Sequence, residues 1–327
     1  MKILYIYRHP DLGYSVGRVF KPIEDEMKKY AEVDSIYLPI PNYSLKGLWK
    51  NIQKARTAVK VKQYDIVHIT GTENYLIPFL CKHKLVVTVH DIGFFTNEWP
   101  SLKALFKYIL FVRVLRKATK VTFISETTKD IAQKYVSINP NQILVIANPI
   151  GKEFVFTSKS LNKNKPVILH MGTNFNKNLD RTIEAIRGMN CTLRIVGNVS
   201  NDQLLTMKKY GIDFSVVQGL TDKQVIEEYQ NCDIVNFPSL QEGFGMPIIE
   251  GQATGRVVIT SNLQPMKGIA GNGAILVDPT DVDSIRNGYK IAMTNYDEIV
   301  KLGCENVKRF SLDLITRKYL TVYKNLC

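Results

Sequence analysis

Short apolar runs rich in Val, Ile and Leu alternate with longer amphipathic segments along the whole of this 327-residue chain. Several of the runs are almost uninterrupted, which is typical of strands buried on both faces of a parallel sheet. Their alternation with helices predicts βαβ units joined by right-handed crossovers. The expected strands cover residues 2–7, 66–69, 85–90, 121–125, 143–147, 167–171, 193–196, 214–218, 234–237, 257–260 and 274–277.

So many strands are too many for one open sheet, and the pattern favours two doubly wound, Rossmann-like α/β domains. Asn-Pro, a glycine and a polar stretch interrupt the pattern at residues 148–165, which marks the expected boundary. In open α/β sheets ligands bind at the carboxyl ends of the strands. Two such domains facing each other would form a cleft at these strand ends, and the motifs described below all follow strands.

Several classes of protein are disfavoured by what the sequence lacks. No GxGxxG and no GxxxxGK[ST] follows an expected strand, which argues against a dinucleotide-dependent oxidoreductase and against a P-loop NTPase. The five cysteines are scattered and form no CxxC, so we expect a reducing cytoplasm and neither a disulfide framework nor a zinc site. No signal peptide and no membrane span is expected, since residues 1–7 run into a strand and the segment 104–115 is interrupted by Lys107 and Arg113.

Positive charge is concentrated in the first half of the chain. Residues 1–150 hold 22 Lys and Arg against 12 Asp and Glu, whereas the remainder holds 21 against 18. Two basic segments with aromatic residues, 46–62 and 103–120, predict amphipathic helices that can lie on an anionic membrane surface; ordinary solvated helices are the alternative. The pI of about 9.3 is not accompanied by a nucleic-acid-binding motif, so no nucleic-acid partner is expected.

Residues 238–250 read Pro-Ser-Leu-Gln-Glu-Gly-Phe-Gly-Met-Pro-Ile-Ile-Glu and carry the most specific signal. Pro247 predicts the first turn of a helix, and the free amides there, with the positive end of the helix dipole, suit a phosphate. The flanking glycines allow a ligand to approach the backbone. Glu242 and Glu250 suit sugar hydroxyls rather than phosphate. Phosphate and sugar together indicate a nucleotide-sugar, although a helix cap with two solvated glutamates would leave the same pattern.

This run resembles the retaining glycosyltransferases of the GT-B fold in family 4 (glycosyltransferases group 1), whose hallmark is two glutamates separated by seven residues with Gly-Phe-Gly after the first. The resemblance implies an acceptor-binding domain at residues 1–155, a nucleotide-sugar-binding domain at 156–309, and a helix at 310–327 that crosses back to the first domain. It implies that Glu242 contacts the donor sugar, that Glu250 holds the ribose, and that the amides of Gly243, Phe244, Gly245 and Met246 hold the diphosphate.

The loop after the expected strand 167–171 resembles the family's pyrophosphate loop. It reads Gly172-Thr173-Asn174-Phe175-Asn176-Lys177-Asn178, and the family has Lys-Asn here, so Lys177 is expected to neutralise the departing diphosphate. A lysine at a helix start is unfavourable, because the helix dipole is positive there. This favours a functional role for Lys177 over that of a solvated surface side chain. An arginine is frequent in the family where Thr173 and Asn176 stand.

Three further segments extend the resemblance. His90 and Asp91 follow a strand on the acceptor side, where a family histidine hydrogen-bonds the donor sugar, although a lone histidine is more often structural. Gly219 and Leu220 resemble the loop that packs on the nucleotide base. The loop containing Gly13 and Tyr14, which the resemblance places on the acceptor side, has single glycines where many members carry a pair.

The resemblance implies transfer, with retention of configuration, of a hexose or N-acetylhexosamine from a UDP- or GDP-sugar to a glycan acceptor. No cofactor and no metal ion is expected. The basic first domain favours a polyprenyl-diphosphate-linked acceptor in surface polysaccharide synthesis, and a cytoplasmic protein peripheral to the inner face of the membrane. A sugar-nucleotide epimerase of the same fold and a catalytically silent partner subunit remain alternatives.

Overall fold

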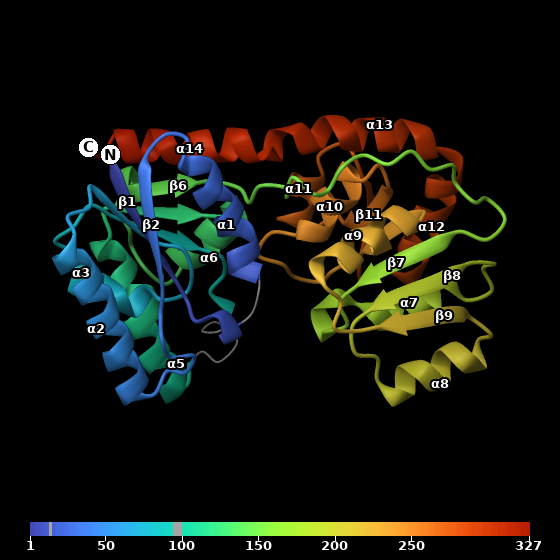
Figure 1. The fold of residues 1–327 in the computed structure, drawn as a ribbon. Helices are drawn as coiled ribbons and strands as arrows, with labels where there is room; N and C mark the ends of the chain where they lie inside the picture. The colour runs from blue at the N-terminus through green and yellow to red at the C-terminus, as the bar shows by residue number, and fades with distance from the viewer. Residues whose placement is uncertain (13–14, 94–99) are drawn as a thin grey trace. The chain divides into compact units, whose positions relative to one another are not determined.

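The computed structural model describes residues 1–12, 15–93 and 100–327, and it divides into two compact units (Figure 1). Unit 1 comprises residues 1–149 together with the C-terminal segment 312–327, and unit 2 comprises residues 150–311.

Unit 1 is built on a six-stranded parallel sheet with the order β2-β1-β3-β4-β5-β6. β1 and β3 to β6 lie where strands are expected from the sequence. β2 was not predicted, because its sequence EVDSIY is an edge strand whose side chains are only partly buried. The strands are β1 (Lys2–Tyr7), β2 (Glu32–Tyr37), β3 (Ile66–Ile69), β4 (Leu85–Val89), β5 (Lys120–Phe123) and β6 (Ile143–Val145).

Helices cover both faces of this sheet. Ser44 and Ser125 cap two of them by accepting a hydrogen bond from an amide in the first turn. The α-helices are α1 (Ser15–Met27), α2 (Leu45–Val61), α3 (Ile77–Leu80), α5 (Leu102–Lys107), α6 (Glu126–Gln133) and α14 (Leu312–Lys324). Shorter elements are the 3-10 helices Pro10–Leu12, Asn74–Leu76, Arg113–Lys117 and Pro140–Gln142 and the π-helix Tyr108–Val112.

The C-terminal helix α14 belongs to unit 1 and forms part of its core, as the sequence led us to expect. Ile315, Tyr319 and Tyr323 pack in one buried cluster with Ile3 and Tyr5 of β1. Buried polar groups reinforce this contact: His68 Nδ1 lies 2.6 Å from the Tyr323 hydroxyl, and His68 Nε2 lies 2.8 Å from Thr88 Oγ1. Burial lowers the pKa of His68 to about 3, so this imidazole is neutral at pH 7.

Unit 2 contains a second six-stranded parallel sheet with the order β12-β11-β10-β7-β8-β9. Its strands are β7 (Val167–Met171), β8 (Thr192–Val196), β9 (Asp213–Val217), β10 (Ile234–Phe237), β11 (Val257–Ser261) and β12 (Ile275–Val277). The helices are α7 (Leu179–Ile186), α8 (Asn201–Lys209), α9 (Asp222–Asn231), α10 (Met246–Ala253), α11 (Met266–Ala270), α12 (Val282–Thr294) and α13 (Tyr296–Val307), with the 3-10 helices Phe175–Lys177 and Lys308–Phe310.

The strand order reverses once in each sheet. In unit 2 the chain begins at β7, runs outward through β8 and β9, and returns to the other side of β7 at β10. In unit 1 the corresponding neighbours are β1 and β3. The prediction of two doubly wound parallel domains is therefore confirmed, and ligands of such sheets bind beyond the carboxyl ends of the strands at the point of reversal.

Candidate functional site

The reversal point of unit 2 brings together two loops that are about 65 residues apart in the sequence. One loop follows β7 and leads to Asn178 at the start of α7, and the other follows β10 and ends at Gly245 at the start of α10. Their backbones are joined where the Leu240 amide donates to the Asn176 carbonyl at 2.8 Å. The lysine and the first glutamate of the two sequence motifs therefore lie in neighbouring loops.

Lys177 and Glu242 form an ion pair across these loops. Lys177 Nζ lies 2.5 Å from Glu242 Oε1, and both side chains are largely shielded from solvent. Asn176 Nδ2 donates to the Gln241 carbonyl at 2.9 Å and approaches the same Glu242 oxygen at 3.3 Å. The Lys177 ammonium also lies 4.8 Å from the centre of the Phe237 ring. The ammonium is thus held at the strand ends rather than extended into solvent.

Gly172 makes room for the Lys177 side chain. Its φ of +82° is unfavourable for other residues, and a Cβ there would lie 3.2 Å from Lys177 Cγ. The Gly172 amide donates to the Val196 carbonyl at 2.8 Å, which fixes the loop to the end of β8. A larger residue at this position would displace the lysine.

The turn before α10 presents backbone amides at the same strand ends. Gly245 has a φ of +111° and precedes the first residue of the helix, Met246, with Pro247 in the first turn as predicted. Phe244 anchors the turn: it is buried and meets Phe310 edge-to-face with 5.9 Å between ring centres. Together with Gly243, this geometry gives a helix N-terminus that suits an anionic group.

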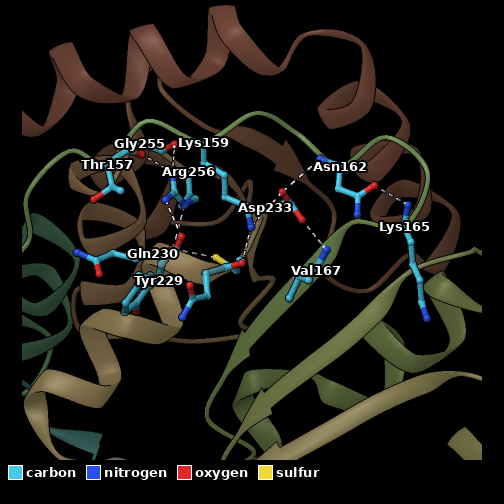
Figure 2. A network of polar contacts seen from close by, with 12 residues as sticks. Thr157, Lys159, Asn162, Lys165, Val167, Tyr229, Gln230, Asp233, Gly255 and Arg256 are labelled. Carbon is cyan, nitrogen blue, oxygen red and sulfur yellow. Dashed lines mark hydrogen bonds and ion pairs between the residues drawn. The ribbon is translucent and has the colours of Figure 1, made fainter.

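Glu250 lies one turn into α10, where it is buried and held by α9. Its Oε2 accepts a hydrogen bond of 2.5 Å from the Tyr229 hydroxyl. The Tyr229 carbonyl in turn accepts from Arg256 Nε at 2.9 Å, and the other Arg256 nitrogens donate to the carbonyls of Thr157, Gly255 and Gln230 (Figure 2). The buried Arg256 thus fixes the end of α9, and through Tyr229 it fixes one oxygen of Glu250.

The remaining predicted donor-side residues lie around this centre. Asn178 is buried with a φ of +64°, and its side-chain amide donates to the carbonyls of Pro238 and Pro279, so it holds loops together. Thr173 packs where a Cβ on Gly197 would lie, only 2.8 Å away. Gly219 and Leu220 follow β9, which β8 separates from β7, and so lie farther along the same edge of the sheet.

His90 of unit 1 lies directly after β4. Its Nε2 donates to the Thr70 carbonyl at 2.9 Å, which leaves Nδ1 as the acceptor nitrogen of the neutral ring. Burial lowers the pKa of His90, so it is uncharged at pH 7. Asp91 is exposed, and its Oδ1 accepts from the Gly93 amide. Gly13 and Tyr14 lie outside the described residues.

Two family models together match almost the whole chain. The model described as Glycosyltransferase Family 4 matches residues 12–154, and the model described as Glycosyl transferases group 1 matches residues 151–308. The chain belongs to glycosyltransferase family 4. The resemblance of the 238–250 run to this family is thereby confirmed.

Curated relatives and solved structures agree with this membership. The chain is 25% identical over 228 residues to the O-antigen chain mannosyltransferase RfbU of Salmonella typhimurium, a match covering 67% of the chain and 63% of the relative. It is 23% identical over 300 residues to an Escherichia coli UDP-Gal:alpha-D-GlcNAc-diphosphoundecaprenol alpha-1,3-galactosyltransferase, covering 82% and 76%. Sucrose-phosphate synthase from Thermosynechococcus elongatus has the same GT-B fold, with a TM-score of 0.82, 16% identity, and coverage of 100% and 99%.

Two residues of this site were not identified from the sequence. Tyr229 and Phe237 are ordinary apolar-face residues of a helix and a strand, and only their contacts with Glu250 and Lys177 give them a place in the site. In the described part of the chain, no group of three or more His, Cys, Asp or Glu side chains is arranged to hold a metal ion.

Proposed function

We propose that this chain transfers a hexose or N-acetylhexosamine from a UDP- or GDP-sugar to a glycan acceptor, with retention of configuration and without a metal cofactor. The observation that carries the proposal is the placing of Lys177, Glu242 and the Gly243–Met246 turn at the reversal point of one sheet. A cation and a helix N-terminus suit a diphosphate, and a shielded carboxylate beside them suits sugar hydroxyls.

In the proposed reaction each group has a separate role. Lys177 and the turn amides bind the diphosphate and stabilise the charge that develops on it as the bond between the sugar and the phosphate breaks; the acceptor oxygen bonds to the sugar and its proton passes to the leaving diphosphate. Glu242 accepts hydrogen bonds from the sugar hydroxyls, and Glu250, fixed by Tyr229, accepts those of the ribose. His90, neutral and with Nε2 committed to Thr70, contributes a hydrogen bond to the sugar.

The acceptor is proposed to be a polyprenyl-diphosphate-linked glycan of a surface polysaccharide. The name of the galactosyltransferase relative includes such a lipid-linked acceptor, and that of the mannosyltransferase relative includes an O-antigen chain. The basic first half of the chain supports an acceptor with an anionic diphosphate.

Association with the inner face of the membrane is part of the same proposal. Leu45 and Trp49 of α2 are 80% and 52% exposed, and Leu102 and Phe106 of α5 are 87% and 49% exposed. Exposed lysines stand on the same helices: Lys46, Lys50, Lys54 and Lys103. Apolar and basic side chains in this combination suit an anionic lipid surface. Within residues 1–12, 15–93 and 100–327, no helix is both long and apolar enough to cross a bilayer.

The test is a transfer assay with radiolabelled UDP-galactose, UDP-N-acetylglucosamine and GDP-mannose, using undecaprenyl-diphosphate N-acetylglucosamine as acceptor. We expect labelled lipid from one donor, loss of at least 100-fold of the rate in Glu250→Ala, and a normal rate in the exposed control Glu305→Ala. A Glu250→Ala protein with unchanged rate and donor affinity would rule out the assignment.

The same assay separates the two alternative functions. An epimerase would convert one nucleotide-sugar into another without acceptor, which chromatography of the unreacted donor detects. A silent subunit would give neither lipid product nor converted donor.

A further inference from the structure

Unit 1 has its own strand-order reversal, between β1 and β3, and two charged residues stand at the carboxyl ends of these strands. Arg8 comes directly after β1, and Glu73 comes four residues after the end of β3. By the rule that applies to unit 2, this is where a ligand of unit 1 binds. None of the motifs of the sequence analysis includes either residue.

Glu73 is a buried carboxylate that lacks full hydrogen bonding. Glu73 is only 2% exposed, and its Oε2 has no hydrogen-bond partner among the described residues. Among the described side chains, the Thr72 hydroxyl contacts Oε1 at 3.5 Å, the limit for a hydrogen bond, and the backbone amide of Glu73 itself also stabilises the carboxylate. Burial of such a carboxylate costs folding free energy, and a ligand hydroxyl that reaches Oε2 would supply the missing hydrogen bond.

The ionisation of Glu73 agrees with this geometry. Burial raises its pKa to about 7, and the nearby Arg8 opposes the rise. After burial, the negative charge of Glu73 also raises the pKa of the Tyr43 and Tyr75 hydroxyls. Near neutral pH the carboxyl group can therefore accept a hydrogen bond when ionised or donate one when protonated, which suits a sugar hydroxyl in either sense.

The aromatic ring of Tyr43 packs on Tyr75, two residues after this glutamate in the sequence. Tyr43 is 44% exposed, and its pKa is raised by burial and by the Glu73 charge, while a hydrogen bond to Thr72 opposes the rise. Edge-to-face contacts hold the ring, with centres 6.3 Å from Tyr75 and 5.4 Å from Phe111. A fixed aromatic ring next to a carboxylate offers an apolar surface for the C–H face of a sugar and a partner for its hydroxyls.

We propose that Glu73, with Tyr43 and Arg8 at its rim, forms a glycan-binding site of unit 1 that receives the sugar of the acceptor. This proposal rests on the proposed transferase function only in identifying the bound glycan as the acceptor. Binding of a glycan at Glu73 is a property of unit 1 alone and is tested without the donor.

The experiment measures saturation-transfer NMR of the full chain with methyl glycosides of mannose, glucose, galactose and N-acetylglucosamine. We expect one or more to bind the wild type and Glu242→Ala equally, which assigns the binding outside the donor site. Binding should weaken at least tenfold in Glu73→Gln and in Tyr43→Ala. No binding of any of the four glycosides to the wild type, or equal binding by Glu73→Gln, would overturn the proposal.

Thermal stability distinguishes this role from a structural one. Because the pKa of Glu73 is raised, its stabilising contribution is present below about pH 4.5 and is lost as pH rises to about 7. Glu73→Gln should therefore have a Tm equal to or above that of the wild type at pH 8, and the difference should shrink toward pH 4.5. A fall of several degrees at pH 8 would mean that Glu73 holds the fold and would overturn the proposal.

The matched control is Glu24→Gln. Glu24 is equally buried in unit 1 but accepts hydrogen bonds from Tyr7 at 2.9 Å and Lys21 at 2.7 Å. Its substitution should lower the Tm and leave glycoside binding unchanged. Failure of unit 2 to bind any nucleoside diphosphate would instead refute the proposed function while leaving the glycoside result intact.

Discussion

Lys177 Nζ and Glu242 Oε1 lie 2.5 Å apart, so the two charged groups proposed for donor binding neutralise each other. A diphosphate that recruits Lys177 must draw it away from Glu242. That movement would release the carboxylate for the hydroxyls of the sugar. Binding of the two halves of a nucleotide-sugar is therefore coupled in this account.

Removing the lysine should weaken binding of the diphosphate. We expect Lys177→Ala to raise the Kd for the cognate nucleoside diphosphate by roughly tenfold to hundredfold, or about 1.4–2.8 kcal/mol, since one charge-assisted contact is lost. Calorimetric titration measures it. The control Lys159→Ala removes another partly shielded lysine of unit 2, paired with Asp233 at 3.4 Å, and should leave the Kd unchanged.

Neutralising the glutamate should separate diphosphate binding from sugar transfer. In Glu242→Gln the ammonium of Lys177 loses its charged partner, so the bare diphosphate should bind as tightly as to the wild type or more tightly. Transfer of the sugar should nevertheless fall by at least 100-fold, since the carboxylate contact is lost. Weaker binding of the bare diphosphate would show that the ion pair does not compete with the ligand.

Tyr229 is expected to act through Glu250. Tyr229→Phe removes the 2.5 Å hydrogen bond, which should lower stability by about 1 kcal/mol and raise the KM for the donor more than it lowers kcat. The control is Tyr289→Phe, because the buried Tyr289 hydroxyl has no hydrogen-bond partner among the described residues, and its loss should not lower the Tm. Equal effects of the two substitutions would refute a positioning role.

Acid should destabilise unit 1 through His68. Its pKa is lowered to about 3 from an ordinary value of 6.5, so its stabilising contribution is present above pH 6.5 and is lost as pH falls toward 3. About 2 kcal/mol should be lost between pH 6.5 and pH 5. At pH 7.5 the Tm of His68→Gln should be lower than that of the wild type. Between pH 6.5 and pH 5 it should change less with pH than the Tm of the wild type. An identical pH slope in both proteins would contradict the assignment.

Membrane binding should depend on the basic face of α2. The triple variant Lys46→Glu, Lys50→Glu, Lys54→Glu should lose most of its sedimentation with vesicles containing phosphatidylglycerol, because about 1 kcal/mol per lysine is lost near the surface. A charge-matched control carries Lys209→Glu, Lys223→Glu and Lys290→Glu on exposed positions of unit 2 and should sediment like the wild type. No sedimentation of the wild type would remove the membrane from the proposal.

The sequence predicted what depends on local pattern. Buried strands such as Ile66–Ile69 and Ile234–Phe237 are continuous apolar runs, and Pro247 marked a helix that begins at Met246. The edge strand Glu32–Tyr37 was not predicted, because its side chains are only partly buried and it forms no continuous apolar run. The basic segment 103–120, expected to be one helix, is divided among α, π and 3-10 turns and the start of β5.

Contacts between distant residues could not be predicted in the same way. Lys177 and Glu242 were each recognised from their own motif, but their pairing depends on the strand order that makes β7 and β10 neighbours. Tyr229 and Glu73 belong to no motif, and only burial and hydrogen bonding distinguish them from other tyrosines and glutamates.

Titration of the purified protein with UDP, GDP, ADP and dTDP tests the central claim most directly, with the Tm as readout, because a ligand that binds only the folded state raises it. The account predicts that one diphosphate raises the Tm of the wild type by several degrees, and that the rise is reduced in both Lys177→Ala and Glu250→Ala. If none of the four raises the Tm, or if both variants respond like the wild type, the reversal point of unit 2 is not the donor site.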